Sequence, residues 1–222
     1  MKYFDAHLHI VPDTVFMQAH ERGVDTFICN AAKQSEWQTV LDIPKRVLGV
    51  WTCLGIHPWY VNEAAMDWRI QLEALLLKNP LTMIGEIGLD KKRPFFEEQK
   101  IFFKEQLKLA QKLKRSVHIH CVGAWPEMIQ IMSQYPDVKA LYHRFNGDEF
   151  VVQKLRFLNS FFSVMEKRYI PVIPDYRLLV ESDAPDGPFG GPDKIPDLVK
   201  SLGLNPDYLN QNLRLFLDDK QV

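Results

Sequence analysis

The sequence has few cysteines, no strong excess of either charge and no long hydrophobic run, and each absence excludes a class of protein. Its three cysteines, Cys29, Cys53 and Cys121, are odd in number, widely spaced and outside any C-x-x-C pattern. This argues against a disulfide framework or a thiolate metal cluster. A reducing compartment fits best, so we expect a cytoplasmic protein.

Charge and hydropathy exclude further classes. The 27 basic and 28 acidic residues give a formal net charge of −1, so no global field would draw the chain to nucleic acid or to an anionic membrane. No apolar run approaches the ~20 residues of a membrane span, and Asp5 comes too early for an apolar signal segment. We expect a soluble protein with neither a membrane partner nor an obligate protein partner.

The pattern along the chain predicts one barrel-shaped domain over residues 1–222. Short apolar runs alternate with helix-like segments, which is typical of a parallel α/β sheet. Eight strands are predicted, at residues 2–7, 24–29, 47–54, 81–87, 116–120, 139–143, 160–164 and 177–181. Eight strands alternating with helices indicate a (β/α)₈ TIM barrel, compact for a fold that uses ~200 to 400 residues.

Two helix predictions test this pattern. Between the fourth and fifth predicted strands, apolar residues recur at helical spacing at Phe96, Phe103, Leu107, Ala110 and Leu113. Pro94 suits the first turn of that helix. Between the last two strands, Pro171 and Pro174 leave room for only about one or two helical turns, so the helix before the eighth strand is predicted to be shortened.

Most potentially reactive side chains fall at the carboxyl ends of predicted strands, where such barrels build their active sites. They are His7 and His9 at the first strand, Glu86 at the fourth, His120 at the fifth, His143 at the sixth and Asp183 after the eighth. Residues two apart in an extended segment share a face, so His7 and His9 can bind the same ion. Imidazoles with carboxylates suit zinc, manganese or iron better than calcium.

Each of these residues alone has an ordinary structural explanation. A lone His-x-His pair occurs on many solvated strands, Glu86 could be a capped loop acid, and Asp183 could be a turn or N-cap residue. A carboxylate that ends an apolar strand needs a partner, however, and a bridging metal is a natural one. The set predicts a divalent-metal-dependent hydrolase in which Asp183 and Glu86 are catalytic.

Seven stretches, in this order along nearly the whole chain, carry a resemblance to a known family: Phe4–His9, Gly55–Pro58, Gly85–Asp90, Val117–His120, His143–Gly147, Leu178–Pro185 and Asn212–Phe216. The sequence resembles the TatD-related metal-dependent deoxyribonucleases of the amidohydrolase-like barrel superfamily. The resemblance implies that His7, His9, Glu86 and Asp183 hold one metal, and that Glu86 is shared with a second metal completed by His120 and His143. It implies hydrolysis of DNA phosphodiesters.

The implied mechanism uses two ions, with zinc, manganese or magnesium as candidates. Two ions lower the pKa of water and neutralise charge on phosphate oxygens. Asp183 would orient or deprotonate the attacking water. Cations beside Asp183 are expected to lower its pKa and keep it ionised.

The sequence also departs from the family pattern. Val122 stands two residues after His120, where the family usually carries an arginine, and residues 186–191 lack its arginine-containing stretch. Arg144 could supply the missing phosphate contact, although it neighbours His143 and adjacent residues in a strand point to opposite faces. Two alternatives therefore stay open: a hydrolase of a small amide, lactone or phosphoester, and a degenerate, non-enzymatic metal-binding barrel.

Other residues have weaker signals. Asp5 is expected to orient an imidazole from outside the ligand set. His57 suits substrate contact or loop scaffolding equally, and His118 suits a hydrogen-bonded core position. The loop aromatics could stack on bases or simply pack the loops; they are Trp59, Tyr60, Trp125 and Phe189.

Overall fold

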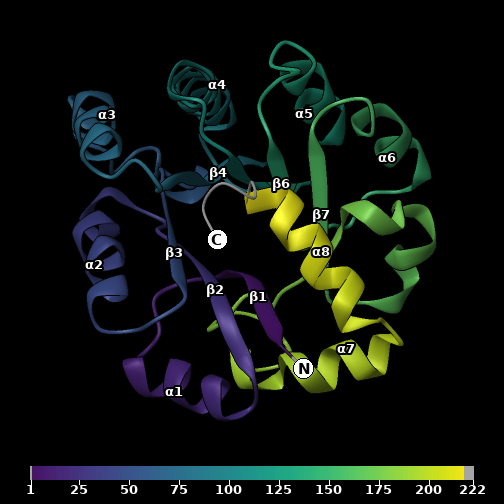
Figure 1. The fold of residues 1–222 in the computed structure, drawn as a ribbon. Coiled ribbons are helices and arrows are strands. Elements are labelled where there is room, and N and C mark those ends of the chain that lie inside the picture. The colour runs from purple at the N-terminus through teal and green to yellow at the C-terminus, as the bar shows by residue number, and fades with distance from the viewer. Residues whose placement is uncertain (1, 218–222) are drawn as a thin grey trace.

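The barrel dominates the computed structural model, which describes residues 2–217 (Figure 1). Eight parallel strands form one sheet in the order β1 to β8, each strand pairing with the next in the chain. The strands are β1 (Tyr3–Leu8), β2 (Val24–Asn30), β3 (Val50–Leu54), β4 (Met83–Asp90), β5 (Val117–Val122), β6 (Ala140–Tyr142), β7 (Ser160–Val164) and β8 (Leu178–Val180). Every predicted strand overlaps an observed one, and the predicted (β/α)₈ barrel is confirmed.

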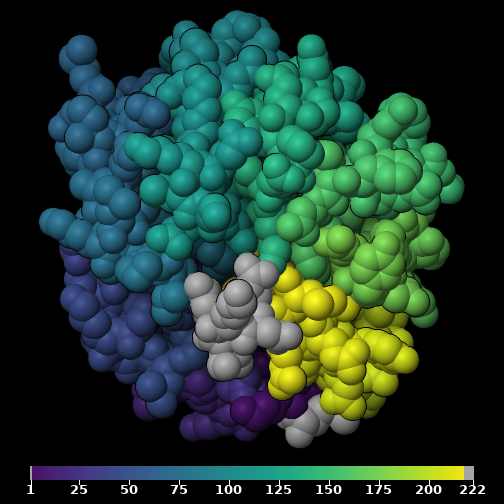
Figure 2. All heavy atoms as spheres, turned by 45° about the horizontal axis from the view of Figure 1, so that its top comes forward, coloured from purple at the N-terminus to yellow at the C-terminus, as the bar shows by residue number. Residues whose placement is uncertain are grey.

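Helices surround the strands and follow them in chain order. The α-helices are α1 (Asp13–Glu21), α2 (Trp37–Asp42), α3 (Trp68–Lys78), α4 (Phe96–Leu113), α5 (Trp125–Met132), α6 (Glu149–Leu155), α7 (Ile195–Leu202) and α8 (Pro206–Leu217). Short 3₁₀ helices lie at η1 (Gln34–Glu36), η2 (Ile43–Lys45), η3 (Pro58–Tyr60), η4 (Lys167–Val172), η5 (Asp175–Arg177) and η6 (Pro192–Lys194). Figure 2 shows the chain passing around the molecule, from purple through teal and green to yellow.

The helix α4 follows the apolar spacing that predicted it, but Pro94 is not in its first turn. Phe95 precedes the helix in a left-handed conformation, with φ of 62°, so the chain before it belongs to a loop. The buried Gln99 side chain donates to the carbonyl oxygens of Pro94 and Asp90, at 2.9 and 3.1 Å. Pro94 therefore serves as a loop acceptor outside the helix.

The connection between β7 and β8 is as short as its prolines predicted. It contains only the 3₁₀ helices η4 and η5, and Pro171 lies inside η4. Within residues 2–217, no helix combines the length and the apolar character that a membrane span requires. Cys29, Cys53 and Cys121 are free and buried.

The first and last strands of the barrel meet at a seam, where hydrogen bonds join the segment after β8 to the end of β1. The Asp183 N–H donates to the His7 carbonyl at 3.0 Å, and the His9 N–H donates to the Ala184 carbonyl at 2.7 Å. The buried carboxylate of Asp5 accepts from the N–H of Ser182, at 2.8 Å, and from its hydroxyl. These bonds hold His7, His9 and Asp183 together.

The helix α8 covers the amino-terminal end of the barrel, across the strands in Figure 1. The Asn212 side chain donates to the Leu178 carbonyl at 2.8 Å, where β8 begins. The Phe216 ring lies 5.4 Å from the His118 ring, between centroids, inside the barrel. The carboxyl ends of the strands lie at the opposite end.

Candidate metal centre

A cavity of about 700 Å³ opens at the carboxyl ends of the strands. Its wall contains five of the six predicted ligands together with a loop histidine: His9, His57, Glu86, His120, His143 and Asp183. His7 is fully buried beneath them, because it is the inward-facing residue near the end of β1 while Leu8 packs the other way. The structure thus brings all six predicted ligands to one place.

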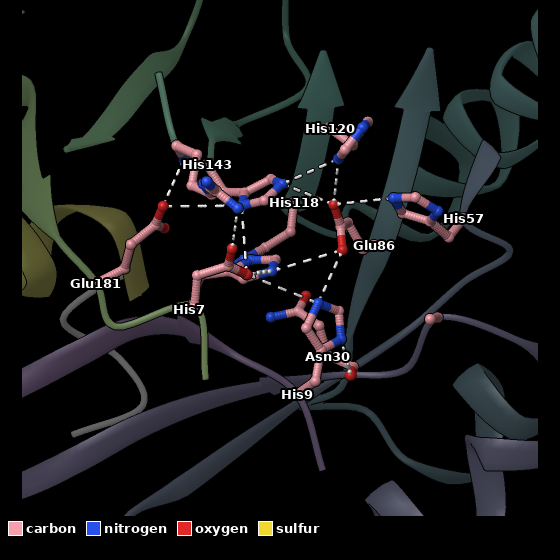
Figure 3. A network of polar contacts seen from close by, with 12 residues as sticks. His7, His9, Asn30, His57, Glu86, His118, His120, His143 and Glu181 are labelled. Carbon is pink, nitrogen blue, oxygen red and sulfur yellow. Dashed lines mark hydrogen bonds and ion pairs between the residues drawn. The ribbon is translucent and has the colours of Figure 1, made fainter. Parts of the chain in front are cut away.

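Glu86 lies at the centre of this cluster (Figure 3). Its Oε2 atom is 3.1 Å from His9 Nε2 and 3.6 Å from His7 Nε2. Its Oε1 atom faces three other imidazole nitrogens, at 2.7 Å from His143, 2.9 Å from His120 and 3.3 Å from His57. The two oxygens of one carboxylate therefore face two different sets of imidazoles.

The prediction that Glu86 ends its strand was wrong. β4 continues to Asp90, and Glu86 lies within it. The pairing of β4 with β5 is irregular between Ile84 and Ile87, which surround Glu86, and regular pairing resumes beyond it. The barrel wall therefore extends past the site, so that Asp90 can also reach it.

Within residues 2–217, three groups of side chains could each hold a metal ion, with ligand atoms within 4.8 Å of one another. The first contains His7, His9 and Asp183, the second His57, Glu86 and His120, and the third His7, His143 and Glu181. The first group consists wholly of predicted ligands. The other two add His57 and Glu181 to the candidates.

The chemistry of these groups fits a divalent cation. His7 Nε2 and His143 Nδ1 are buried and have no hydrogen-bond partner among residues 2–217. Burying a polar nitrogen without a partner is costly, and a cation held by the third group, of His7, His143 and Glu181, would satisfy both nitrogens. Imidazoles mixed with carboxylates are the donor set that zinc and manganese accept.

Protonation in the cluster follows from burial and from the charges around Glu86. Burial opposes the charge of Glu86, but the imidazoles around it, led by His143, hold its pKa well below the ordinary value. Burial, with the nearby His143, lowers the pKa of His7 well below its ordinary value. Glu86 is therefore an anion, and His7 is a neutral imidazole with a lone pair to share.

Asp183 follows β8 in a left-handed conformation, with φ of 54°. Its Oδ1 atom lies 3.9 Å from the Nε2 atoms of both His7 and His9. Burial raises the pKa of Asp183, and the negative Glu181 and Glu86 raise it further, against the lowering effect of His143. In the protein alone, the pKa of Asp183 is therefore raised, whereas bound cations were expected to lower it.

Arg144 reaches the same site, although it directly follows His143. β6 ends at Tyr142, so neither residue is held in the alternation of a strand. Arg144 has a left-handed φ of 41°, which turns its side chain back toward the cavity. Its Nη1 atom donates to Asp183 Oδ2 at 2.9 Å.

Asp5 and the two remaining histidines have distinct places. Asp5 contacts Ser182 and the backbone N–H of His7 rather than an imidazole ring, and burial raises its pKa to about 7. His57 points into the cavity while its Nδ1 accepts from the Trp59 N–H at 3.2 Å, so it contacts the site and also supports its loop. His118 is a core residue, as predicted, 3.3 Å from His7 between Nδ1 atoms.

Sequence reasoning missed the importance of Glu181 and Asp90. Glu181 is fully buried at the end of the apolar run of β8, 3.7 Å from His143 Nδ1, and accepts from the Ser163 hydroxyl. The argument that singled out Glu86, a carboxylate ending an apolar run, also applies to Glu181. Asp90 Oδ2 accepts from Trp59 Nε1 at 2.7 Å and lies 3.6 Å from His120 Nε2.

Sequence comparison with known proteins finds the family that the motifs of this chain resemble. Residues 4–211 match the model of the family described as TatD related DNase. The protein named 3'-5' ssDNA/RNA exonuclease TatD from Cronobacter turicensis is 29% identical over 188 residues, which cover 78% of this chain and 72% of that protein. The protein of the same name from Erwinia tasmaniensis is 30% identical over 189 residues, covering 78% and 73% of the two chains.

Solved structures show the same fold. The crystal structure of the TatD homologue YjjV from Escherichia coli superposes with a TM-score of 0.89, at 22% identity, covering 96% of this chain and 97% of that one. A TatD family hydrolase from Entamoeba histolytica gives 0.79 at 18% identity, covering 97% and 98%.

Proposed function

Because the chain belongs to the TatD related DNase family, we propose that it is a divalent-metal-dependent nuclease that hydrolyses phosphodiester bonds of DNA. The observation that carries this proposal is the position of Glu86, whose two carboxylate oxygens face separate sets of candidate metal ligands in the wall of an open cavity. Relatives named as 3'-5' exonucleases support the same polarity for this chain.

We assign two metal positions to the cluster. His7, His9 and Asp183, with Glu86 Oε2, would hold one ion, and Glu86 Oε1 with His120 and His143 would hold the second. His57, 3.3 Å from Glu86 Oε1, is a further donor for the second position. Bound divalent ions lower the pKa of water and neutralise charge on phosphate oxygens.

We assign the role of general base in hydrolysis to Asp183. Its Oδ1 faces the cluster while its Oδ2 is held by Arg144, so one oxygen is positioned toward the reacting centre. In this position Asp183 would accept the proton of the attacking water, as a general base. The buried Asp5 supports this geometry, since it fixes Ser182, the residue before Asp183.

Removal of metal should abolish hydrolysis. We expect chelated protein to leave a 5'-labelled single-stranded oligonucleotide uncut, and protein reloaded with manganese, magnesium or zinc to shorten it progressively from the 3' end. Elemental analysis should find up to two ions per chain. Protein that binds no divalent metal, and that none of the three ions activates, would exclude the proposal. Metal-loaded protein that cuts a lactone, an amide or a small phosphoester but not DNA would favour the small-substrate alternative.

His118 is expected to control how tightly metal binds at His7. His7 Nε2 must offer a lone pair to the ion, so its Nδ1 carries the proton and donates to His118 Nδ1. His118→Phe keeps a ring beside Phe216 but removes this acceptor, and metal affinity should fall by about 10- to 100-fold. Calorimetric titration with manganese measures the loss. His20→Gln, on α1 and outside the cavity, is the control; equal affinity in both variants would contradict the role of His118.

A further inference from the structure

Arg144 and Asn146 lie together on one wall of the cavity, beside the metal-binding cluster. The residue between them, Phe145, is 1% exposed and points into the core, where its ring packs on Phe162. Two polar side chains therefore face the cavity from the segment that follows β6.

The guanidinium of Arg144 is held in place by a hydrogen bond, but most of its N–H donors have no acceptor within residues 2–217. The backbone N–H of Arg144 donates to Glu181, and its Nη1 donates to Asp183 Oδ2. A guanidinium carries five N–H donors in a rigid plane. The Arg144 side chain is 48% exposed, and its other donors contact no acceptor within residues 2–217. They remain available to a ligand in the cavity.

The amide of Asn146 is oriented by Trp125. Trp125 Nε1 donates to Asn146 Oδ1 at 3.1 Å. Because an indole N–H can only donate, the atom that faces it must be the amide oxygen. The NH₂ group is then left to donate, and it has no acceptor in the described part of the chain. Arg144 and Asn146 thus both offer donors to the cavity.

Resting on the proposed nuclease function, we propose that Arg144 and Asn146 form the subsite that binds the non-bridging oxygens of the scissile phosphate. Asp183, which Arg144 contacts, is itself 3.9 Å from two candidate ligands, so the subsite adjoins the reacting centre. Arginine binds phosphate through paired donors. Among the described residues of the wall, Arg144 is the only arginine, and Lys92 is the only other side chain with a permanent positive charge.

A second substitution, at Val122, can test this assignment by restoring the phosphate contact in a variant that lacks Arg144. β5 pairs with β6 through Ile119 and Tyr142, so Val122 ends the strand next to the segment that carries Arg144. Val122 lines the same cavity and offers no donor. An arginine placed there can supply the phosphate contact from the neighbouring strand.

The experiment compares wild type, Arg144→Met, Arg144→Lys and the double variant Arg144→Met with Val122→Arg, all loaded with manganese. Inorganic phosphate binding is measured by calorimetry, and kcat and KM on single-stranded DNA are measured separately. Loss of one charge-stabilising donor should reduce kcat/KM of Arg144→Met by about 100- to 1,000-fold. Phosphate affinity should fall by about tenfold or more, since bonds between charged partners are the strong ones. Arg144→Lys should retain only part of the wild-type phosphate affinity and kcat/KM. The double variant should regain phosphate affinity.

Controls separate this inference from the proposed function. Arg156→Met, at an exposed arginine outside the cavity, should match wild type. Phosphate affinity and kcat/KM of Arg144→Met within about twofold of wild type would overturn the subsite while leaving the nuclease assignment intact. Loss of bound metal in Arg144→Met, with no rescue by Val122→Arg, would also overturn it and make Arg144 a structural residue. Absence of DNA cleavage by wild type defeats the nuclease proposal, and the phosphate titration still decides the subsite.

Discussion

Replacing Glu86 with glutamine is expected to weaken metal binding by more than about 100-fold and to abolish hydrolysis. Structural zinc sites supply roughly 10–16 kcal/mol of binding free energy, so one of four ligands contributes about 3 kcal/mol. Glu86 faces both sets of imidazoles, and a glutamine there offers one neutral oxygen instead of two charged ones. Both metal positions should lose affinity together.

The Glu86→Gln measurement needs a metal titration and a check of the fold. Manganese calorimetry gives the affinity, and thermal unfolding in chelator shows whether the barrel survives the loss of a buried anion. Glu149→Gln, at an exposed acid in the first turn of α6, should bind metal as wild type does. Retention of two tightly bound ions in Glu86→Gln would refute the bridging role.

Replacing Asp183 with asparagine should give the second large effect, a fall in kcat of about 100- to 10,000-fold, because a general base contributes that much. The asparagine oxygen can still accept from Arg144, so the cavity wall should keep its shape. Metal affinity should fall less than in Glu86→Gln, since Asp183 contributes to only one of the two assigned metal positions, whereas Glu86 contributes an oxygen to each.

Activity of Asp183→Asn must be compared at matched metal occupancy, verified by elemental analysis, because Asp183 is also a candidate ligand. Circular dichroism and the unfolding temperature report on the fold, which should change little. Full turnover at equal occupancy would remove Asp183 from the mechanism and leave it as a ligand only.

Most of the barrel could be predicted from the sequence because its signals are local. Each apolar run of a buried parallel strand is visible in the chain itself, and so are the prolines that shorten the connection before β8. The position of Pro94 was not predictable in this way. The buried Gln99 holds the Pro94 carbonyl, and this contact depends on tertiary packing rather than on helix propensity.

The site was predicted less completely because its geometry depends on backbone irregularities. Strand alternation placed Arg144 away from His143, but β6 stops at Tyr142 and the left-handed Arg144 turns into the cavity. The apolar run predicted that Glu86 ends its strand, yet β4 continues past Glu86 through an irregular pairing. Neither event leaves a signal in residue periodicity.

The ligand assignment itself stays a prediction. The six predicted residues converge, which their positions near strand ends already implied. His57 and Glu181 extend the set of candidates, and the metal titrations above would show which of them bind. Asp5 accepts hydrogen bonds from the backbone N–H groups of His7 and Ser182, contacts that only the seam between β1 and β8 reveals.

That seam also sets when the centre can be completed during protein synthesis. Asp5 and Ser182 are 177 positions apart, so the ribosome synthesises His7 and His9 long before it adds Asp183. The group of His57, Glu86 and His120 comes from the middle of the chain, whereas that of His7, His9 and Asp183 requires nearly all of it. A translation product that stops before Asp183 therefore lacks the residue we assign as the base. We expect such a product to leave DNA uncut.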